Sequence, residues 1–549
     1  MIHACLLLLL PLAAPSFNLT KYPVPDRNLE PPYDQILYVS LDGDDTNAGT
    51  RGVPLRNLRT AIERAESGVR IVMRGGLYYN ISLGAISKPV LIQAFPHEQV
   101  YLLGSVPVDG WTKRGANWAV EWNNPFAAYQ PDAACTQMDD TGFKCRPEQV
   151  FVGGEPLVQV GAESDVKAGT FFVDNAAGRL LIGSDPTGRT VEVSVQERAV
   201  SLGSTASIDG IGFAHYGSHL GHGAVIANGQ HSSFYFCSFV QNAGDAVMLN
   251  GSYHVVQSSV INYNGWRGIY GKSATGSLLL SNTVNFNFAR APNFAACTGD
   301  SCLLAAANIG NAIEASFRVD SNRFESNGAN GLRVTVDYPA SVIRNIARGN
   351  TLAGFVFAHA NDSVFASNVA VGNAIGMPVI SCPEAFVYNN DLVGNKQGLV
   401  VTAAPPTKNA LVRVRNNLFS NNLEQQLSVT AATQADLATT FGILDHNGYF
   451  QRNASGTRPF GWGNQTFVYH DGFVAASGFD KAPPSIDVRN QAAQPFFVNE
   501  AAGNFNLQAN SVAVNAGAAL PTRIARELNV KSSPVNMGEF SRALEWPGQ

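Results

Sequence analysis

A six-residue phrase that begins and ends with asparagine returns five times in the second half of the chain. No other feature constrains the fold as strongly. The copies are Asn322–Asn327, Asn345–Asn350, Asn368–Asn373, Asn390–Asn395 and Asn417–Asn422. The step of about 22 residues lies in the range of solenoid repeats, and helical repeats are longer. Each repeat contains two or three short alternating apolar runs separated by Asn/Gly turns, which predicts strands and not helices.

One repeat therefore predicts one coil of a stacked β structure. At about 3.3 Å per strand residue, 22 residues close one turn of a parallel β-helix. An asparagine at the same corner of every coil can hydrogen-bond its neighbours above and below, as stacked asparagines do in cross-β structures. Asparagine also tolerates the left-handed backbone of a tight corner. We therefore assign these asparagines to the fold and not to chemistry.

The composition agrees with stacked, weakly charged sheets. Of the 549 residues, 14% are charged and 52 are glycine, and the formal net charge is −5. A solenoid can use most of such a length as one body. The chain has no basic excess or cluster of the kind that nucleic-acid binding requires, so we expect no nucleic-acid partner.

The first 16 residues predict export. An apolar run, Leu6–Leu10, is followed by small residues up to Ser16, which is the pattern of a secretory signal peptide. The run is too short to cross a bilayer, and no later run is long enough. We expect a secreted, extracellular monomer with no membrane span.

Six cysteines remain beyond the signal segment, an even number that is consistent with disulfides in an exported protein. The local pairs Cys135–Cys145 and Cys297–Cys302 are the expected bridges. Cys237 falls at the position of the repeated asparagine, so a buried free thiol is the alternative for it. The cysteines lack paired Cys-x-x-Cys spacing, which makes a metal site the minor interpretation.

Both ends of the chain resemble a known family. A strand is expected at Ile36–Ser40, and a loop rich in turn-forming residues follows it; the stretch Tyr38–Thr50 carries the resemblance at this end. An amphipathic helix is expected at about 58–65, and strands are expected at 69–73, 76–79, 90–94 and 100–103. Together with Gln494–Asn499, these features resemble secreted right-handed parallel β-helix proteins, a superfamily of polysaccharide lyases and glycoside hydrolases. The resemblance implies an all-β, right-handed parallel β-helix whose open end the helix covers. It implies a polysaccharide ligand but not a reaction, because function depends on sites carried by a fold.

The resulting organisation has five parts. They are a signal peptide (1–16), a cap with the first coils (17–104), an inserted β-rich module (105–200), the central β-helix (201–430) and the C-terminal coils and tail (431–549). Short strands are expected inside the module at 150–157, 169–174, 179–182 and 191–194. Short helices are expected at 434–440 and 469–476. In similar β-helix glycosidases, such modules help to wall the substrate cleft.

The strand after each Asn/Gly corner should present chemistry on its outer face. Alternation places Leu332, Val334 and Val336 inside. Stacking the coils by their corners lines up the outward residues Tyr270, Lys272, Glu314, Ser316, Arg333, Thr335, Asp337, Val356, Ala358, Pro378 and Ile380.

The middle of this face is ionic, with Lys272, Glu314, Arg333 and Asp337. Coils about 4.8 Å apart can bring two carboxylates to the roughly 5–5.5 Å that retaining glycosidases use. We therefore assign Glu314 and Asp337 as the catalytic carboxylates, with Arg333 and Lys272 beside them. The alternative is a solvated ladder of charges that contributes little to stability.

The resemblance also reveals a departure. β-Xylosidase-like members carry an Asp after the Gly-Leu strand start and a Glu one coil later, and the matching positions here are Thr335 and Ala358. Either catalysis has moved to Glu314 and Asp337, or the chain binds polysaccharide without cleaving it. A calcium-dependent lyase would use Arg333 or Lys272 as the base and would need an acidic cluster for the metal, of which the sequence offers only two close carboxylates. A glycoside hydrolase is the favoured activity and a lyase the less favoured one.

Aromatic and histidine side chains could line the groove. Trp266 and Tyr270 could stack on sugar rings, and the equal alternative for Trp266 is a corner residue that shields the edge of its coil. His215, His219 and His222 lie in a glycine-rich loop and not on a helix, so we assign no metal and no cofactor. We expect His215 to form part of the cleft wall.

Overall fold

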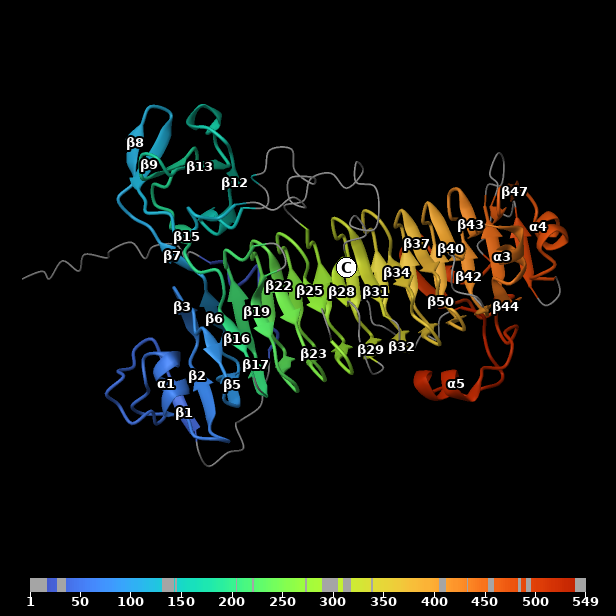
Figure 1. Cartoon of the computed structure of the whole chain (residues 1–549), viewed down its shortest axis with the longest axis horizontal. Coiled ribbons are helices and arrows are strands. Elements are labelled where there is room, and N and C mark those ends of the chain that lie inside the picture. Colours follow the sequence, from blue (N-terminus) through green and yellow to red (C-terminus); the bar gives the residue numbers. More distant parts are fainter. Residues whose placement is uncertain are drawn as a thin grey trace, which may run out of the picture.

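Three long parallel sheets run the length of the protein and form its body, and the strands of successive coils follow one another along the long axis (Figure 1). The computed structural model describes residues 17–26, 36–130, 143, 146–203, 205–219, 222–271, 274–288, 305–309, 317–336, 339–403, 411–431, 433–452, 459–481, 485–489 and 495–538. Within these ranges each long sheet has 13 strands, and successive coils add one strand to each sheet. The chain is therefore a right-handed parallel β-helix, as the repeat and the resemblance predict.

Sheet 1 contains β1 (Ile36–Val39), β2 (Arg70–Met73), β5 (Val90–Ala94), β17 (Ala206–Asp209), β20 (Ser233–Tyr235), β23 (Val255–Gln257), β26 (Leu278–Leu280), β29 (Phe317–Asp320), β32 (Ala340–Ile343), β35 (Val364–Ala366), β38 (Phe386–Tyr388), β41 (Val412–Arg415) and β44 (Phe441–Asp445). Sheet 2 contains β3 (Gly76–Tyr78), β6 (Val100–Leu103), β18 (Ile211–Ala214), β21 (Ser238–Val240), β24 (Val260–Asn262), β27 (Thr283–Asn285), β30 (Arg323–Glu325), β33 (Ile346–Arg348), β36 (Val369–Val371), β39 (Asp391–Val393), β42 (Leu418–Ser420), β45 (Gly448–Gln451) and β48 (Ile486–Arg489). Sheet 3 contains β4 (Ala85–Ile86), β16 (Val200–Leu202), β19 (Gly223–Ala227), β22 (Asp245–Leu249), β25 (Ile269–Gly271), β28 (Ala305–Ile309), β31 (Asn330–Thr335), β34 (Phe355–Ala358), β37 (Ile375–Ile380), β40 (Gln397–Ala403), β43 (Gln425–Ala431), β46 (Phe460–Trp462) and the antiparallel β47 (Gln465–Phe467).

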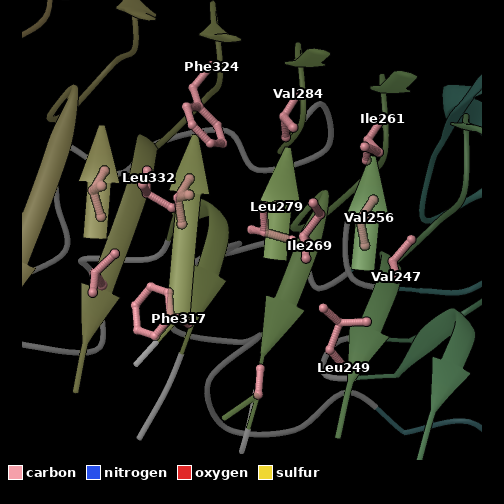
Figure 2. Packing of buried hydrophobic residues seen from close by; sticks show 14 of the residues in the cluster. Val247, Leu249, Val256, Ile261, Ile269, Leu279, Val284, Phe317, Phe324 and Leu332 are labelled. Carbon is pink, nitrogen blue, oxygen red and sulfur yellow. The ribbon is translucent and has the colours of Figure 1, made fainter. Parts of the chain in front are cut away.

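Each coil runs from sheet 1 to sheet 2 to sheet 3, and the inward side chains of the three sheets share one core. Figure 2 shows apolar side chains of neighbouring coils inside the β-helix; Val256 of sheet 1, Ile261 of sheet 2 and Ile269 of sheet 3 belong to one coil, and all three are part of the main core. In β31, Leu332 and Val334 are fully buried and so is Val336 just beyond it, whereas Arg333 and Thr335 are partly exposed. The predicted alternation is therefore confirmed where the strand is described.

Two continuous ladders hold the coils in register. One follows the corner between sheets 1 and 2 through Cys237, Ser259, Asn282, Asn322, Asn345, Asn368, Asn390, Asn417 and Asn447. The other follows the corner between sheets 2 and 3 through Asn242, Asn264, Asn287, Asn327, Asn350, Asn373, Asn395 and Asn422. Successive asparagines bond Nδ2 to Oδ1 at 2.9 to 3.3 Å, which confirms the predicted ladder. The expected buried position of Cys237 is also confirmed.

The left-handed residue of each corner differs from the prediction. It is the residue directly before the ladder asparagine, as with Arg344 (φ 56°) and Ser367 (φ 58°), and not the asparagine itself. The ladder asparagine keeps an ordinary backbone because its side chain must point inward to reach the next coil. Glycine therefore fills the left-handed position in several coils, including Gly349 and Gly372, where it carries no Cβ penalty.

The inserted segment leaves the β-helix after β6 and returns at β16, so it interrupts the corner between sheets 2 and 3. It forms two small sheets from β7 (Ser105–Pro107), β8 (Thr112–Arg114), β9 (Asn117–Glu121), β10 (Val150–Val152), β11 (Glu155–Pro156), β12 (Val158–Gln159), β13 (Thr170–Asp174), β14 (Arg179–Ile182) and β15 (Val191–Ser194), with a 3-10 turn at Glu163–Asp165. The segment has its own apolar core, built on Phe171, Leu180 and Ile182. The module stands to one side of the β-helix near its N-terminal end (Figure 1).

Short helices lie at both ends of the solenoid. Helix α1 (Leu58–Arg64) packs Leu58, Ala61 and Ile62 into the core beside the first strands, as expected. Helices α3 (Gln434–Ala438) and α4 (His470–Ser477) also form where the sequence predicts them. The tail adds a hairpin of β49 (Phe497–Asn499) and β50 (Asn504–Leu507), and helix α5 (Thr522–Leu528).

The tail runs back along the outside of the solenoid. Its residues Phe496, Phe497 and Met537 pack on the outer faces of sheet-2 residues such as Ile346 and Leu418. Ile524 and Leu528 of α5 pack on sheet-1 residues Ile343, Val364 and Tyr388. The last described segment therefore covers apolar positions that the repeat leaves on the outside.

Several sequence predictions fall outside the described residues. They include the signal segment and the cysteines Cys135, Cys145, Cys297 and Cys302, so the expected disulfides and export stay predictions. Cys237 and Cys382 are buried free thiols. In the described part of the chain, no helix is long and apolar enough to cross a membrane.

Candidate functional site

A cavity of about 430 Å³ lies between the inserted module and the corner of sheets 2 and 3. Its walls combine aromatic rings, side-chain amides and charged groups. The lining residues include Lys21, Tyr22, Phe143, Glu148, Gln149, Phe151, Glu155, Gln159, Gln241, Asn242, Tyr263 and Gly265. The volume falls within the range of small-molecule sites, about 300–1,000 Å³.

The N-terminal segment closes one side of the cavity. Val24 and the side chain of Gln99 exchange two hydrogen bonds, of 2.7 and 3.0 Å, which fix the segment on sheet 2. Lys21 then reaches across to Glu155 of the module at 2.8 Å. The bond to Glu155 raises the pKa of Lys21, and burial raises the pKa of Tyr22.

The polar wall of the cavity is fixed by bonds between the module and the β-helix. Gln149 of the module donates to the carbonyl of Gln241 at 3.0 Å, and the side chain of Gln241 donates to the Tyr22 hydroxyl at 3.2 Å. Asn124 donates to Glu148, which is 4% exposed, at 3.0 Å. The amide and carboxylate oxygens are therefore pre-oriented, as a ligand rich in hydroxyl groups requires.

Flat aromatic rings extend from the cavity along the coils. The ring of Tyr263 meets that of Tyr22 edge-on at 5.6 Å and stacks on that of Phe286 at 4.8 Å with an interplanar angle of 4°. Tyr263 is 37% exposed and Phe286 is 41% exposed. Two parallel, solvent-facing rings on adjacent coils form a surface on which sugar rings can stack.

These two rings occupy backbone positions that disfavour large side chains. Tyr263 (φ 57°) and Phe286 (φ 54°) each hold the left-handed position before a ladder asparagine. The coils beside the module carry Gln241, Tyr263 and Phe286 at this position, and later coils carry the smaller Ser326, Gly349, Gly372, Gly394 and Asn421. A left-handed backbone costs an L-residue roughly 1–2 kcal/mol, and the serine and glycine at this corner of later coils show that the turn itself does not require a large ring.

His215 lies behind the wall and not on it. Its ring is fully buried, stacks on Phe151 at 3.5 Å, and places Nδ1 2.9 Å from Glu192 Oε2 and Nε2 3.1 Å from Gln241 Oε1. The predicted substrate contact would require this side chain to be uncovered. The structure shows instead a buried support that orients Gln241 toward the cavity.

The aromatic residues predicted on the groove occupy different environments. Trp266 is 5% exposed, packs against Phe288 at 4.9 Å and belongs to the main core. Tyr270 is partly exposed on the outer face of sheet 3, with the guanidinium of Arg267 3.5 Å from the centre of its ring. Arg267 in turn bonds the fully buried carboxylate of Asp245. Tyr270 is thus held flat at the start of the predicted ionic face.

The predicted ionic face is only partly visible. Lys272, Glu314 and Asp337 lie outside the described residues. Arg333 is partly exposed and donates to the Thr335 hydroxyl at 3.1 Å. The strand between those of Tyr270 and Arg333 is β28, and its Asn308 pairs with both, so Asn308 takes the register position expected for Glu314. The predicted register of Glu314 between Tyr270 and Arg333 is therefore wrong, because the strand of this coil ends at Ile309. The catalytic roles of Glu314 and Asp337 stay predictions.

His219 and His222 meet a residue that the sequence analysis did not single out. Glu197, at the exit of the module, lies 3.2 Å from His219 Nε2 and 3.1 Å from His222 Nδ1. Burial lowers the pKa of His219. His215 belongs to the separate buried group with Glu192, so the three histidines do not form one cluster.

The main residues of the cavity were missed by sequence reasoning. A usable signal existed for Tyr263 and for Phe286, which stacks on it beside the cavity, since Tyr263-Asn264 and Phe286-Asn287 place an aromatic residue directly before a ladder position in consecutive coils. Glu148 and Gln241 offered no such signal, because their proximity depends on how the aperiodic module folds back onto the coils.

The architecture defines the class of protein: a right-handed parallel β-helix with an inserted β module beside a polar, aromatic cavity. Residues 289–440 match the family model described as "Right handed beta helix region". Pectate lyase PEL9 of Emericella nidulans is 38% identical over 74 residues, which cover 12% of this chain and 18% of that protein. Uncharacterized protein YwoF of Bacillus subtilis is 35% identical over 72 residues, covering 12% and 15%. The chain thus matches less than a fifth of the length of these two relatives.

Among solved structures, the complex of XylC with xylose superposes with a TM-score of 0.62. The match covers 85% of this chain and 88% of XylC, at 13% sequence identity. At this identity the likeness shows a shared fold and says nothing of a shared reaction.

Proposed function

We propose that the protein is a secreted carbohydrate-active β-helix protein that holds a polysaccharide in the cavity beside its inserted module. The single observation that carries this proposal is the pair of large aromatic residues, Tyr263 and Phe286, at left-handed corners next to that cavity. Later coils show that small residues satisfy the same corner. The fold alone gives no reason for the larger rings, whereas stacking on sugar rings does.

The chemistry of the cavity fits a sugar ligand. A saccharide presents apolar ring faces edged by hydroxyl groups, and the cavity offers rings and fixed amides in the same space. Gln149 and Gln159 can donate and accept, whereas Glu148 supplies carboxylate oxygens for hydroxyl donors. XylC, which shares the fold, is seen with the sugar xylose.

Glycoside hydrolysis is the reaction that we propose, with Glu314 and Asp337 as the carboxylates and Arg333 and Lys272 beside them. The cavity includes Gly265 and Asn242 of the corner from which sheet 3 begins, so a bound glycan would enter next to the outer face of that sheet. A lyase reaction, with Arg333 or Lys272 as the base, is the less favoured chemistry.

Binding without cleavage is the second candidate, and one observation favours it. Thr335 and Ala358 are register partners on adjacent coils and stand where similar β-xylosidases carry their catalytic Asp and Glu. Neither side chain can act as an acid, a base or a nucleophilic carboxylate. Under this alternative the cavity would bind glycan and the outer face of sheet 3 would do no chemistry.

A panel of plant, algal and fungal polysaccharides tests the proposal. Binding is measured by affinity electrophoresis and calorimetry. Turnover is measured by new reducing ends and by the ultraviolet absorbance of unsaturated products, so that hydrolase and lyase activities are separated. We expect one polymer class to bind and release reducing ends, and we expect Asp337→Asn to abolish release while leaving binding and the melting temperature unchanged.

Glycine variants test the site itself. Tyr263→Gly and Phe286→Gly remove the rings at positions whose φ suits glycine, so folding should be retained and glycan binding should weaken at least tenfold. Tyr253→Gly is the matched control, because Tyr253 is also exposed (46%) and left-handed (φ 60°) but stacks on His231 at a different corner. The proposal would be wrong if Tyr253→Gly weakened glycan binding as much as Tyr263→Gly does. It would also be wrong if no polymer of the panel bound to the protein. Retained binding without turnover would select the second candidate.

A further inference from the structure

The loop that carries His219 and His222 meets the exit of the module at one point, and three side chains gather there. Every pair of candidate ligand atoms from Glu197, His219 and His222 lies within 4.8 Å. Glu197 Oε1 lies 3.2 Å from His219 Nε2 and 3.1 Å from His222 Nδ1. The group is separate from the glycan cavity described above.

The β-helix itself brings these residues together. Glu197 comes three residues before Val200 of β16, and His222 comes three residues before Val225 of β19, and Val200 pairs with Val225. The two side chains therefore start from equivalent positions on neighbouring coils, about 4.8 Å apart in the stacking direction. His219, three residues earlier in the same loop, is half-buried against the ring of Tyr129 at 4.8 Å.

We propose that Glu197, His219 and His222 form a binding site for one divalent transition-metal ion of the zinc type. Zinc takes imidazole nitrogen at about 2.0–2.1 Å, which places two ligand atoms of a tetrahedral site about 3.3 Å apart. The measured separations of 3.1 and 3.2 Å are close to that edge. Two nitrogens and one carboxylate favour zinc, cobalt or nickel over calcium and magnesium, which prefer all-oxygen sites.

Three protein ligands leave a fourth position open. Closed structural zinc sites use four protein ligands, and catalytic sites keep one position for water or substrate. The ligands lie just before β16 and β19, and the half-exposed His222 and Glu197 leave the group open to solvent. The ion would thus be able to bind a water molecule or a hydroxyl group of a ligand there.

Arg198 is the group that a metal must displace. Its Nη2 lies 3.3 Å from Glu197 Oε1 and 3.5 Å from His222 Nδ1. The guanidinium supplies the positive charge that balances Glu197 in the metal-free protein, and its side chain, 30% exposed, can turn to solvent. Removal of this charge should therefore strengthen metal binding, an effect opposite to that of removing a ligand.

The experiment measures zinc binding to the full-length protein after removal of metal with a chelator. Calorimetry should show one Zn²⁺ per chain, and Co²⁺ in its place should give the intense visible bands of a four-coordinate ion. Glu197→Gln, His219→Ala and His222→Ala should each weaken zinc binding at least tenfold, whereas Arg198→Met should strengthen it severalfold. All four should keep the melting temperature of the metal-free protein.

His97→Asn is the matched control, because it removes an exposed histidine that lies 2.8 Å from Asp26, and asparagine suits its left-handed backbone (φ 60°). It should leave zinc affinity and stoichiometry unchanged. The proposed site would be wrong if the wild-type protein bound no zinc, or if all three ligand variants still bound zinc as the wild type does. It would also be wrong if Arg198→Met weakened zinc binding.

Discussion

Arg267 and Asp245 pair between neighbouring coils, Asp245 at the start of β22 and Arg267 just before β25, with Nε 2.9 Å from Oδ1 and Nη2 2.6 Å from Oδ2. The carboxylate is fully buried, and the same guanidinium supports the ring of Tyr270 at 3.5 Å. One ion pair thus links the stability of two coils to the position of an aromatic side chain on the outer face.

The first prediction concerns this pair. Arg267→Met leaves the Asp245 carboxylate buried without its cation, so it should lower the free energy of unfolding by about 3–5 kcal/mol. Urea denaturation measures the loss. Lys396→Met, which breaks the exposed pair of Lys396 with Glu424 at 3.3 Å, should cost less than about 1 kcal/mol. Equal losses in the two variants would contradict the buried role of Arg267.

The second prediction concerns the ladder between sheets 1 and 2. Asn345 is fully buried, accepts from Asn322, and donates to Asn368 and to the carbonyl of Val319. Asn345→Ala should cost about 1–3 kcal/mol for each buried group left without its partner. Thermal unfolding should show this loss, and Asn361→Ala, at a half-exposed turn, should stay near the wild type. A ladder variant as stable as the turn variant would show that the ladder does not set coil stability.

The sequence was sufficient for the repeating part of the molecule because each coil repeats the same physical requirement. A buried side chain at Leu332 and a ladder amide at Asn345 can be inferred from spacing alone. The cavity could not be inferred in this way. Its walls combine Tyr22, Glu148 and Gln241, which come from three unrelated segments, and no periodicity indicates where an aperiodic module will dock.

The expected ionic face shows a different limit of sequence reasoning. Aligning the corners of the repeat predicts Glu314 at the register position between Tyr270 and Arg333, but the strand paired there is β28, Ala305–Ile309. The long segment after Asn287 removes the regular step on which the register depended. The alternation within a strand was predictable, whereas the register across an irregular corner was not.

The third prediction concerns acid unfolding through Asp320. Burial by itself would raise the pKa of Asp320, but hydrogen bonds from Arg344, Arg318 and Ser321 outweigh it and lower the pKa. A carboxyl with a lowered folded-state pKa stabilises the protein above its unfolded pKa of about 3.9, and this contribution is lost as the pH falls through the folded-state value.

The urea concentration at the midpoint of denaturation, measured at a series of pH values from 7 downward, should therefore decrease once the pH is below about 4. Asp320→Asn should be less stable at pH 7 and should show a smaller decline with acid. Asp42→Asn, at an exposed turn, should retain the full decline. If the stability of Asp320→Asn declined with falling pH as steeply as that of the wild type, Asp320 would not contribute to acid unfolding.

The fourth prediction concerns Cys382. The thiol is 1% exposed, and burial raises its pKa to about 12, so it should not react with a thiol reagent at pH 8 in the folded protein. Cys382→Ala should leave the native thiol count unchanged and lower the denatured count by one. A native count that falls with this variant would show that the coil around Cys382 opens on the timescale of labelling.

The tail has a consequence for the order in which the protein can be completed. Residues 496–537 cover apolar side chains of coils that lie as much as 190 residues earlier, including Ile343 and Ile346. During synthesis the coils can stack as they leave the ribosome, but this outer strip stays uncovered until residues 496–537 emerge. A nascent chain that has completed its coils but lacks this segment therefore still exposes apolar surface that can aggregate.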